Sequence, residues 1–219
     1  MPVRGALERY LIKPGSKVDF ANYDSGEKSL FLGEKEEFEF QFDHLQDQLQ
    51  QLQKVLYAQN KHRILVVMQA MDTGGKDGCI KHVFSHIDPQ GIHVRSFKKP
   101  SEEELSYDFL WRVHQKVPHR GQLVIFNRSH YEAVLAERLL EGAPNAKRFW
   151  QARYRTINAI EKHWHDSGTR IIKVWLHQSE AEQKERLLKR LDEPRKRWKF
   201  DPSDLDTFAQ REPYLDAMA

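Results

Sequence analysis

The stretch RILVVMQAMDTGGKD, residues 63–77, decides the fold. Residues 63–70 form a continuous apolar run bounded by polar residues, which is typical of a strand buried on both faces of a sheet. The residues that follow resemble the phosphate-binding pattern G-x-x-x-x-G-K-[ST], with Ala70 in place of the first glycine and Asp77 in place of the Ser or Thr. That pattern requires a buried strand before the loop and a helix after it, and we predict this helix over residues 76–86.

Strand and helix patterns alternate through the rest of the chain. Further strands are predicted over residues 92–97, 122–126 and 170–176. Helices are predicted over residues 101–117, 148–164 and 179–193, the first and last of them opened by Ser-x-x-Glu capping sequences. This alternation predicts an α/β fold, with a parallel sheet covered by helices on both faces.

Before the first strand, apolar residues recur at alternating steps of four and three, which predicts a helix with a narrow apolar seam. The seam consists of Phe38, Phe42, Leu45, Leu49, Leu52 and Leu56. It could pair with another subunit or pack on its own domain, and we favour packing on its own domain.

Composition excludes several classes of protein. Charged residues make up 31% of the 219 residues and the mean hydropathy is −0.75, while no apolar run approaches the roughly 20 residues of a membrane span. The single cysteine, Cys79, excludes an intrachain disulfide and agrees with a reducing cytoplasm. Residues 184–199 hold eight basic and three acidic residues, a run that suits a solvated helix face or an anion-binding surface.

The loop after residue 70 is the first candidate site. We expect the backbone amides of Thr73, Gly74 and Gly75 to face a phosphate at the N-terminus of the following helix, where the helix dipole favours an anion. Lys76 adds a compact positive charge. Asp72 is the expected Mg²⁺ ligand, because the hydroxyl that normally binds the metal is missing. A plain Gly-rich turn is the competing interpretation.

The second candidate segment, LVIFNRSHYE at residues 123–132, begins with a predicted buried strand. Ligands of open α/β sheets bind beyond the carboxyl ends of the strands, so Asn127 and Arg128 are expected at the same edge as Asp72. Arg128 suits stabilisation of phosphoryl oxygens, although a salt bridge to Glu132 would be its ordinary role. Asn127 could orient a water or a phosphate, and Glu132 could bind metal or shape the acceptor site.

Several motifs, in order, resemble the polyphosphate kinase 2 family. They are MDTGGKDG, SFKKPSEEEL, FLWRVH, IFNRSHYE and KRWKFDPSDL, spread over residues 71–205. The resemblance implies a P-loop kinase-like fold with a basic helical lid. It also implies transfer of a terminal phosphoryl group from inorganic polyphosphate to a nucleoside phosphate, with Mg²⁺ or Mn²⁺.

By this resemblance, Asp72 and Lys76 belong to the Walker A loop, and Asn127 and Arg128 to the Walker B segment. Asn127 followed by SHYE is similar to the subgroup that accepts both nucleoside mono- and diphosphates. The expected acceptors are therefore AMP and ADP, or alternatively GMP and GDP, and the reverse transfer is also expected. The residues expected to track the polyphosphate chain are Lys81, Arg190, Arg195 and Arg197.

We therefore expect one domain over residues 1–219, with a helical extension over about 1–60, a core over about 61–178 and a lid over about 179–205. Members of the family usually continue several dozen residues beyond the lid, so we expect this sequence to be part of a longer chain. The expected protein is a cytoplasmic homo-oligomer that binds polyphosphate and nucleotides, but neither nucleic acid nor membrane.

Two other functions compete with this one. An ATP-dependent nucleotide or small-molecule kinase could use the same fold, but the missing Ser or Thr after Lys76 disfavours it. A non-catalytic nucleic-acid binder could use the basic run at residues 184–199, but it leaves the loop and Asp72 unexplained.

Overall fold

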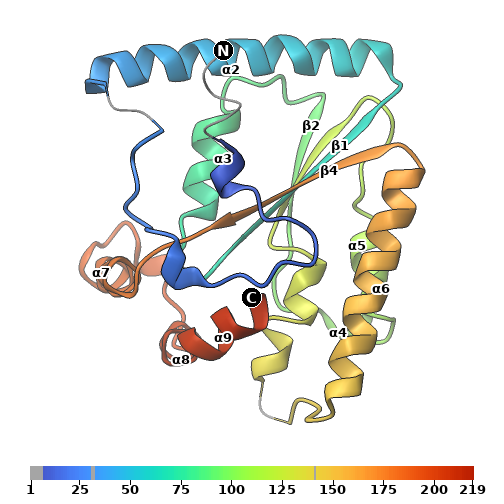
Figure 1. Cartoon of the computed structure of the whole chain (residues 1–219), viewed down its shortest axis with the longest axis vertical. Helices are drawn as coiled ribbons and strands as arrows, with labels where there is room; N and C mark the ends of the chain where they lie inside the picture. Colours follow the sequence, from blue (N-terminus) through green and yellow to red (C-terminus); the bar gives the residue numbers. More distant parts are fainter. Residues whose placement is uncertain (1–6, 31–32, 141) are drawn as a thin grey trace.

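The computed structural model describes residues 7–30, 33–140 and 142–219, and its centre is a four-stranded parallel sheet (Figure 1). The strands lie in the order β2-β3-β1-β4. Their bounds are Arg63–Ala70 for β1, Ile92–Ser96 for β2, Leu123–Asn127 for β3 and Thr169–Leu176 for β4. All four predicted strands are confirmed. Because β1 lies between β3 and β4, the loop that follows it starts at the middle of the sheet's carboxyl edge.

Helices and loops connect the strands, and the structure confirms four of the predicted helices, here α2, α3, α6 and α7. The helices, with 3-10 helices marked η, are η1 (Glu8–Tyr10), η2 (Phe20–Asn22), α2 (Lys35–Gln59), α3 (Lys76–Phe84), α4 (Glu102–Leu105), α5 (Trp111–His114), η3 (His130–Ala133), η4 (Glu137–Leu139), α6 (Lys147–Asp166), α7 (Glu180–Asp192), η5 (Arg197–Lys199), α8 (Ser203–Ala209) and α9 (Arg211–Met218). In the described part of the chain, none of them is long and apolar enough to cross a membrane.

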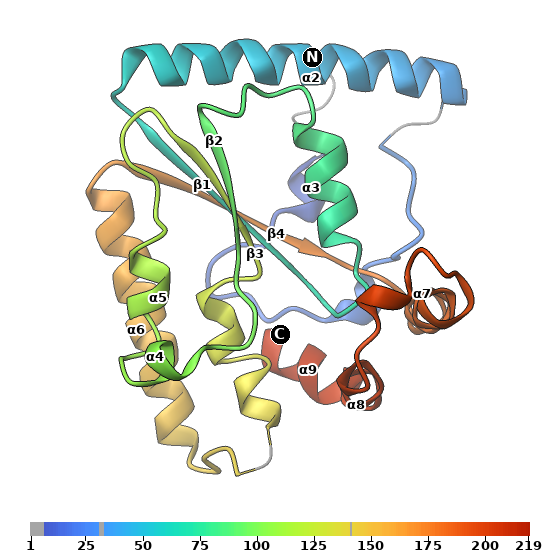
Figure 2. The same ribbon diagram turned by 180° about the vertical axis from the view of Figure 1, so that it is seen from behind.

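Alternate residues of β1 point to opposite faces of the sheet, and each face is covered. Leu65 lies in a buried cluster with Trp164 of α6, whereas its neighbour Val66 lies in another with Ile80 of α3. Figures 1 and 2 show α6 and α3 on opposite sides of the sheet. The α/β fold with helices on both faces is therefore confirmed.

The helix predicted over residues 101–117 is wrong in its extent. The capping box at Ser101 is present, but α4 ends at Leu105 and a separate helix, α5, begins at Trp111. Between them the Asp108 carboxylate accepts a hydrogen bond from the Leu110 amide, and the Ser106 hydroxyl donates to Glu103 O. Such local bonds from side chain to backbone compete with the helical ladder, which explains the break.

The N-terminal helix forms as predicted, but it packs only part of the predicted seam against the domain. Of the six seam residues only Leu56 is buried, and the other fully buried positions of α2 are Gln46 and Gln53. The Gln46 amide donates to the carbonyl of His82 at 2.6 Å, near the end of α3. Phe42 and Leu49 are half-buried, and Phe42 stacks on His82 of α3 with ring centroids 4.4 Å apart. Phe38, Leu45 and Leu52 are exposed, so the expected packing on the domain is confirmed for half of the seam and wrong for the other half.

Candidate functional site

The loop between β1 and α3 is compact because glycine occupies position 74. A Cβ on Gly74 would lie 2.5 Å from the Cβ of Ala70 and 2.8 Å from Met71 O, closer than any side chain allows. Thr73 and Gly75 both have left-handed backbone, with φ of 59° and 82°. Ala70 is tolerated in place of the usual glycine because the missing side chain of Gly74 leaves room for its methyl group.

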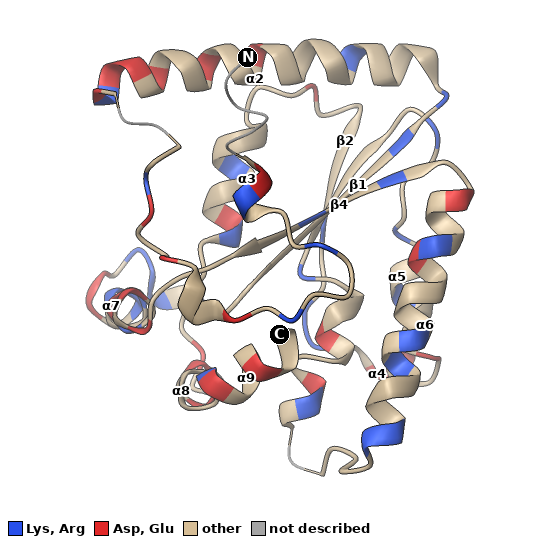
Figure 3. Ribbon diagram, viewed as in Figure 1, with Lys and Arg blue, Asp and Glu red and all other residues tan. Residues whose placement is uncertain are grey.

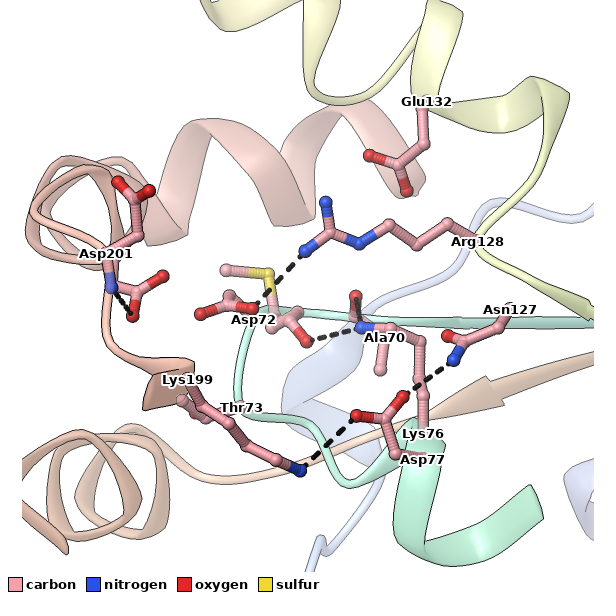
Figure 4. Close-up of polar contacts among 12 residues, drawn as sticks. Ala70, Asp72, Thr73, Lys76, Asp77, Asn127, Arg128, Glu132, Lys199 and Asp201 are labelled. Atoms are coloured by element: carbon pink, nitrogen blue, oxygen red, sulfur yellow. Dashed lines mark hydrogen bonds and ion pairs between the residues drawn. The ribbon is translucent and has the colours of Figure 1, made fainter. Parts of the chain in front are cut away.

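Lys76 is folded back across this loop. Its Nζ donates to the carbonyl oxygens of Ala70 and Met71, each at 3.1 Å, and the side chain is buried (Figure 4). Burial, and secondarily the charge of Arg128, lower the pKa of Lys76 to about 8. The Gly74 amide also donates to Met71 O, so in this structure it does not face an anion as expected.

Asp72 gathers two guanidinium groups that come from distant parts of the chain. Its Oδ1 lies 3.4 Å from Arg128, which directly follows β3, and its Oδ2 lies 3.0 Å from Arg190 of α7. The ion pair of Arg128 is thus with Asp72 and not with Glu132. Arg190 also binds Asp204 of α8 at 2.6 Å. The cluster therefore joins the loop, the end of β3 and the predicted lid.

The pKa values of the two carboxyl groups in this cluster, Asp72 and Asp204, are shifted in opposite directions. Burial opposes ionisation of Asp72, but Arg190, a hydrogen bond with Asp204 and the charge of Arg128 together hold its pKa below the usual range. Burial, and further the charge of Asp72, raise the pKa of Asp204. Asp204 was not singled out from the sequence, although it lies in KRWKFDPSDL, a motif that carried the family resemblance.

The two unusual residues of the site contact each other. The Asn127 amide donates to Asp77 Oδ1 at 2.6 Å, and Lys199 of η5 lies 3.6 Å from Asp77 Oδ2 (Figure 4). Phosphate-binding loops usually place a hydroxyl at position 77 and a carboxylate at position 127. Here the carboxylate stands on the loop and the neutral donor on the strand, and a hydrogen bond joins the two side chains.

Side chains from β4 onwards hold the backbone of the loop, and the sequence analysis did not single them out. Gln178 donates to Asp72 O at 3.0 Å, and Arg186 of α7 donates to Thr73 O at 3.2 Å. Arg211 of α9 in turn donates to the carbonyl of Gln178 at 2.7 Å. The loop is therefore fixed from α7 and α9 as well as by its own glycines.

The remaining predicted residues lie outside this cluster. Glu132 accepts a hydrogen bond from Gln69 at 3.0 Å, and Figure 4 shows Arg128 between Glu132 and Asp72. Lys81 is exposed on α3, and Arg195 and Arg197 are exposed beyond the end of α7. Of the three lid arginines predicted to hold phosphate, only Arg190 reaches the loop.

A buried polar network fixes the segment that follows Arg128. Glu161 of α6 receives hydrogen bonds from Tyr131 at 2.8 Å and from Lys173 at 2.8 Å, and His130 Nε2 lies 3.0 Å from it. Burial opposes ionisation of Glu161, but these partners, His130 first, lower its pKa to about 2. The network ties η3 to α6 and β4, and thereby sets where Arg128 and Glu132 stand.

The donor atoms of the site fit a hard cation that takes most of its ligands from elsewhere. Among the described residues, no group of three or more His, Cys, Asp or Glu side chains is arranged to hold a metal. Asp72 and Asp204 supply carboxylate oxygens side by side. Mg²⁺ commonly takes one or two carboxylates and completes its shell with water and substrate phosphates, so this donor set fits it.

Comparisons with known proteins agree on one family. A family model described as Polyphosphate kinase 2 matches residues 33–219. An AMP/ADP-polyphosphate phosphotransferase from Meiothermus ruber is 45% identical over 211 residues, which is 96% of this chain and 78% of the relative. An ADP-polyphosphate phosphotransferase from Rhodopseudomonas palustris is 43% identical, over 96% of this chain and 76% of the relative. The crystal structure of Polyphosphate Kinase 2 from Arthrobacter aurescens superposes with a TM-score of 0.86 at 39% identity, covering 93% of this chain and 73% of that one.

Proposed function

The chain belongs to the polyphosphate kinase 2 family, and we propose that it moves the terminal phosphoryl group of inorganic polyphosphate to AMP and ADP, with GMP and GDP as the alternative acceptors, and catalyses the reverse transfer. One observation carries the proposal. Lys76, Arg128 and Arg190 converge on Asp72 at the carboxyl edge of a parallel sheet. Such a concentration of positive charge beside a phosphate-binding loop suits a donor and an acceptor that are both polyanions.

The reaction breaks the bond between the terminal phosphorus of polyphosphate and the bridging oxygen next to it. The terminal phosphorus then bonds to an oxygen of the nucleotide's terminal phosphate, and the polyphosphate chain, shortened by one phosphate, leaves with the bridging oxygen. Catalysis of such transfers is chiefly positioning and stabilisation of charge on the migrating group. We assign the second role to Arg128 and Lys76. Arg128 can exchange Asp72 for phosphoryl oxygens with little change of geometry, because a guanidinium binds both kinds of group in the same planar manner.

Lys76 can likewise exchange its present hydrogen-bond acceptors for phosphate oxygens. Its hydrogen bonds to the carbonyls of Ala70 and Met71 hold the ammonium at the loop without substrate. Phosphate oxygens carry more negative charge than carbonyls and accept the same N–H donors in stronger bonds. An approaching phosphate also offsets the desolvation that lowers the pKa of Lys76, and so keeps the lysine protonated.

We assign residues 70–77 as the Walker A loop and residues 123–128 as the Walker B segment, with Mg²⁺ or Mn²⁺ as the cofactor. Asp72 is its proposed ligand, with Glu132 as the second carboxylate and Asn127 orienting a water or a phosphate. The metal would neutralise charge that develops on the phosphate oxygens. The lowered pKa of Asp72 supports this assignment, because the carboxylate stays ionised although burial opposes its charge.

The proposed function also covers the basic residues of the lid, the location of the enzyme in the cell and its assembly. Arg190 lies within reach of the loop, and the exposed Lys81, Arg195 and Arg197 extend the cationic surface that would follow the polyphosphate chain. We also propose a cytoplasmic enzyme, in keeping with its single free cysteine, and one that acts as a homo-oligomer.

Donor profiling tests this function. The purified protein is supplied with polyphosphate or ATP as donor and with AMP or ADP as acceptor, and the nucleotides formed are separated by chromatography. We expect ATP to form from ADP when polyphosphate is present, and Lys76→Ala to abolish most of that signal. Phosphorylation of AMP by ATP without any use of polyphosphate would instead identify an ATP-dependent kinase. No transfer from either donor would also refute the proposal.

A further inference from the structure

A guanidinium group on α9 is buried behind the phosphate-binding loop without a carboxylate partner. Arg211, the first residue of α9, is 8% exposed and donates to Gln183 Oε1 at 2.6 Å and to the carbonyl of Gln178 at 2.7 Å. Both acceptors are neutral, and among the described residues no Asp or Glu side chain forms an ion pair with Arg211. Burying a charge without an opposite charge is costly, so the position of Arg211 requires an explanation other than packing.

The local structure around Arg211 does not supply that explanation. Residues 203–218, which span α8 and α9, contain four acidic residues and one basic residue, Arg211, so carboxylates are available on the same two helices (Figure 3). Arg211 binds neutral oxygens instead. It also lies in the first turn of α9, where the helix dipole disfavours a positive charge. An arginine at this position therefore stabilises neither the helix nor a local ion pair.

The two acceptors of Arg211 lead to a single carbonyl group of the loop. Gln178 Nε2 donates to Asp72 O at 3.0 Å, and Nε2 of the fully buried Gln183 donates to the same oxygen at 3.4 Å. Because a glutamine amide has one oxygen and one nitrogen, the bond from Arg211 to Gln183 Oε1 turns Gln183 Nε2 towards the loop. The bond to Gln178 O holds the backbone that carries the other donor. Arg211 thus orients both donors to Asp72 O.

Hydrogen bonds to Asp72 O fix the peptide group that joins Asp72 to Thr73. In a trans peptide the C=O and N–H bonds point in opposite directions, so Thr73 N–H points away from the glutamines. Within the described part of the chain this N–H has no hydrogen-bond partner, whereas the Gly74 amide donates to Met71 O. Thr73 also has a φ of 59°, a conformation that a β-branched residue adopts only when its surroundings hold it. The contacts to Asp72 O supply that support and leave Thr73 N–H available to a phosphate oxygen.

We propose that Arg211 is a positioning residue for phosphate binding. Through Gln183 and Gln178 it holds the Asp72–Thr73 peptide so that Thr73 N–H faces the phosphate at the loop. The inference rests on the proposed function, in which this loop holds the polyphosphate chain. The charge of Arg211 also polarises the hydrogen bonds that run from guanidinium to amide to carbonyl, which strengthens Thr73 N–H as a donor.

Binding of inorganic tripolyphosphate without nucleotide, measured by isothermal titration calorimetry, tests this role. Arg211→Met keeps the length of the side chain but removes its donors and its charge, and it should weaken binding roughly tenfold. Arg211→Lys keeps the charge but lacks the planar fork that reaches both acceptors, so it should recover only part of the loss. Arg63→Met is the matched control, because Arg63 donates to the carbonyl of Ser167 at the other end of β1. Its affinity should equal that of the wild type.

A double-mutant cycle tests whether Arg211 acts through Gln183. Gln183→Met removes the amide while Arg211 keeps its bond to Gln178 O, so binding should weaken by no more than in Arg211→Met. Because Gln183 lies between Arg211 and the loop, the double variant should bind about as weakly as Arg211→Met alone. If Arg211 acted directly on the anion through its charge, the two losses would add instead.

The amide signal of Thr73 in ¹H–¹⁵N spectra gives a readout that a merely structural role would not move. Tripolyphosphate should shift this signal in the wild type and shift it less in Arg211→Met. The Gly74 amide, which donates to Met71 O, is the internal comparison and should move less than that of Thr73. If Arg211→Met does not fold, Gln183→Met carries the test, with the same changes expected in affinity and in the Thr73 signal.

Four results would overturn the inference. They are wild-type affinity in Arg211→Lys, additive losses in the double variant, a Thr73 signal that tripolyphosphate does not shift in the wild type, and wild-type binding by a folded Gln183→Met. Phosphoryl transfer is assayed separately with AMP and ADP. Loss of binding in the variants without any transfer by the wild type would refute the proposed function and leave the inference standing. Transfer at the wild-type rate by Arg211→Met would refute the inference alone.

Discussion

The contact between Asp77 and Asn127 predicts that exchanging these two side chains is far less harmful than changing either one. In Asn127→Asp a second carboxylate takes the place of an amide that lies 2.6 Å from Asp77 Oδ1. In Asp77→Asn the negative charge of the group that accepts the hydrogen bond from Asn127 is lost, and Lys199 loses its ion-pair partner. The double variant restores one amide and one carboxylate of the same shapes, with their positions reversed.

The size of the effect follows from the exposure of the pair. A hydrogen bond to a charged group contributes about 1.5–3 kcal/mol when protected from water. The Asp77 side chain is 69% exposed, so screening reduces the loss for Asn127→Asp to about 1–2 kcal/mol. In a chain of this size about 1 kcal/mol changes the melting temperature by about 2–4 °C, so we expect Asn127→Asp to melt about 2–8 °C lower at neutral pH.

The effect should also depend on pH in a definite direction. In the wild type, burial opposes ionisation of Asp77, but Asn127 and the charge of Lys199 outweigh it and lower its pKa. In Asn127→Asp, repulsion between two carboxylates raises the pKa of one of them. The resulting loss of stability is then present at neutral pH and disappears as the pH falls and that carboxylate is protonated.

Thermal melting of the wild type, the two single variants and the double variant, all without divalent cations, forms a double-mutant cycle. The matched control is Asn22→Asp, because the Asn22 amide donates to Asp19 in an exposed pair that contains neither Asp77 nor Asn127. We expect a coupling energy of at least about 1 kcal/mol and recovery of most of the stability in the double variant. The reasoning is refuted if the double variant is no more stable than the weaker single variant.

Three further predictions concern the charges of the site. Lys76→Ala should lower turnover by about a hundredfold or more. Wild-type kcat/KM should fall as the pH rises through about 8, because Lys76 of the free enzyme loses its proton there. If the residual activity of Lys76→Ala falls over the same alkaline pH range, that fall belongs to another group. Asp72→Asn should move the curve of rate against Mg²⁺ concentration to higher Mg²⁺, and an unchanged curve would place the metal elsewhere, with Glu132 the next candidate. Glu161→Gln should cost about 1–3 kcal/mol in urea unfolding at neutral pH. The wild type, whose Glu161 pKa is lowered to about 2, should lose that advantage as the pH falls from about 4.5 towards 2, and equal acid sensitivity of the two proteins would contradict the role of the network.

Local patterns in the sequence were sufficient to predict the layout of the core. The apolar runs at residues 63–70 and 122–126 are strands buried on both faces, because a parallel sheet covered by helices leaves no side for polar residues. The Ser-x-x-Glu sequence at Ser179 begins α7 where predicted, since a cap depends only on atoms three residues apart. The glycine and lysine spacing likewise predicted a loop between a buried strand and a helix, and the loop lies between β1 and α3.

Contacts between distant residues could not be predicted in this way. Asp72 and Arg190 are separated by 118 positions, and no local period in the sequence relates them. Asp204 gained its role only because α8 packs beside the loop, and the two departures at Asp77 and Asn127 became one feature only when β3 was placed next to β1.

Helix α2 shows the same division within one element. The spacing of its apolar residues predicted a helix, and a helix forms. The side that it buries was decided by the carbonyl groups at the end of α3, which need donors and receive them from Gln46 and Gln50. A sequence period records which residues lie on one side of a helix, whereas the tertiary structure decides which side meets the rest of the protein and which stays exposed.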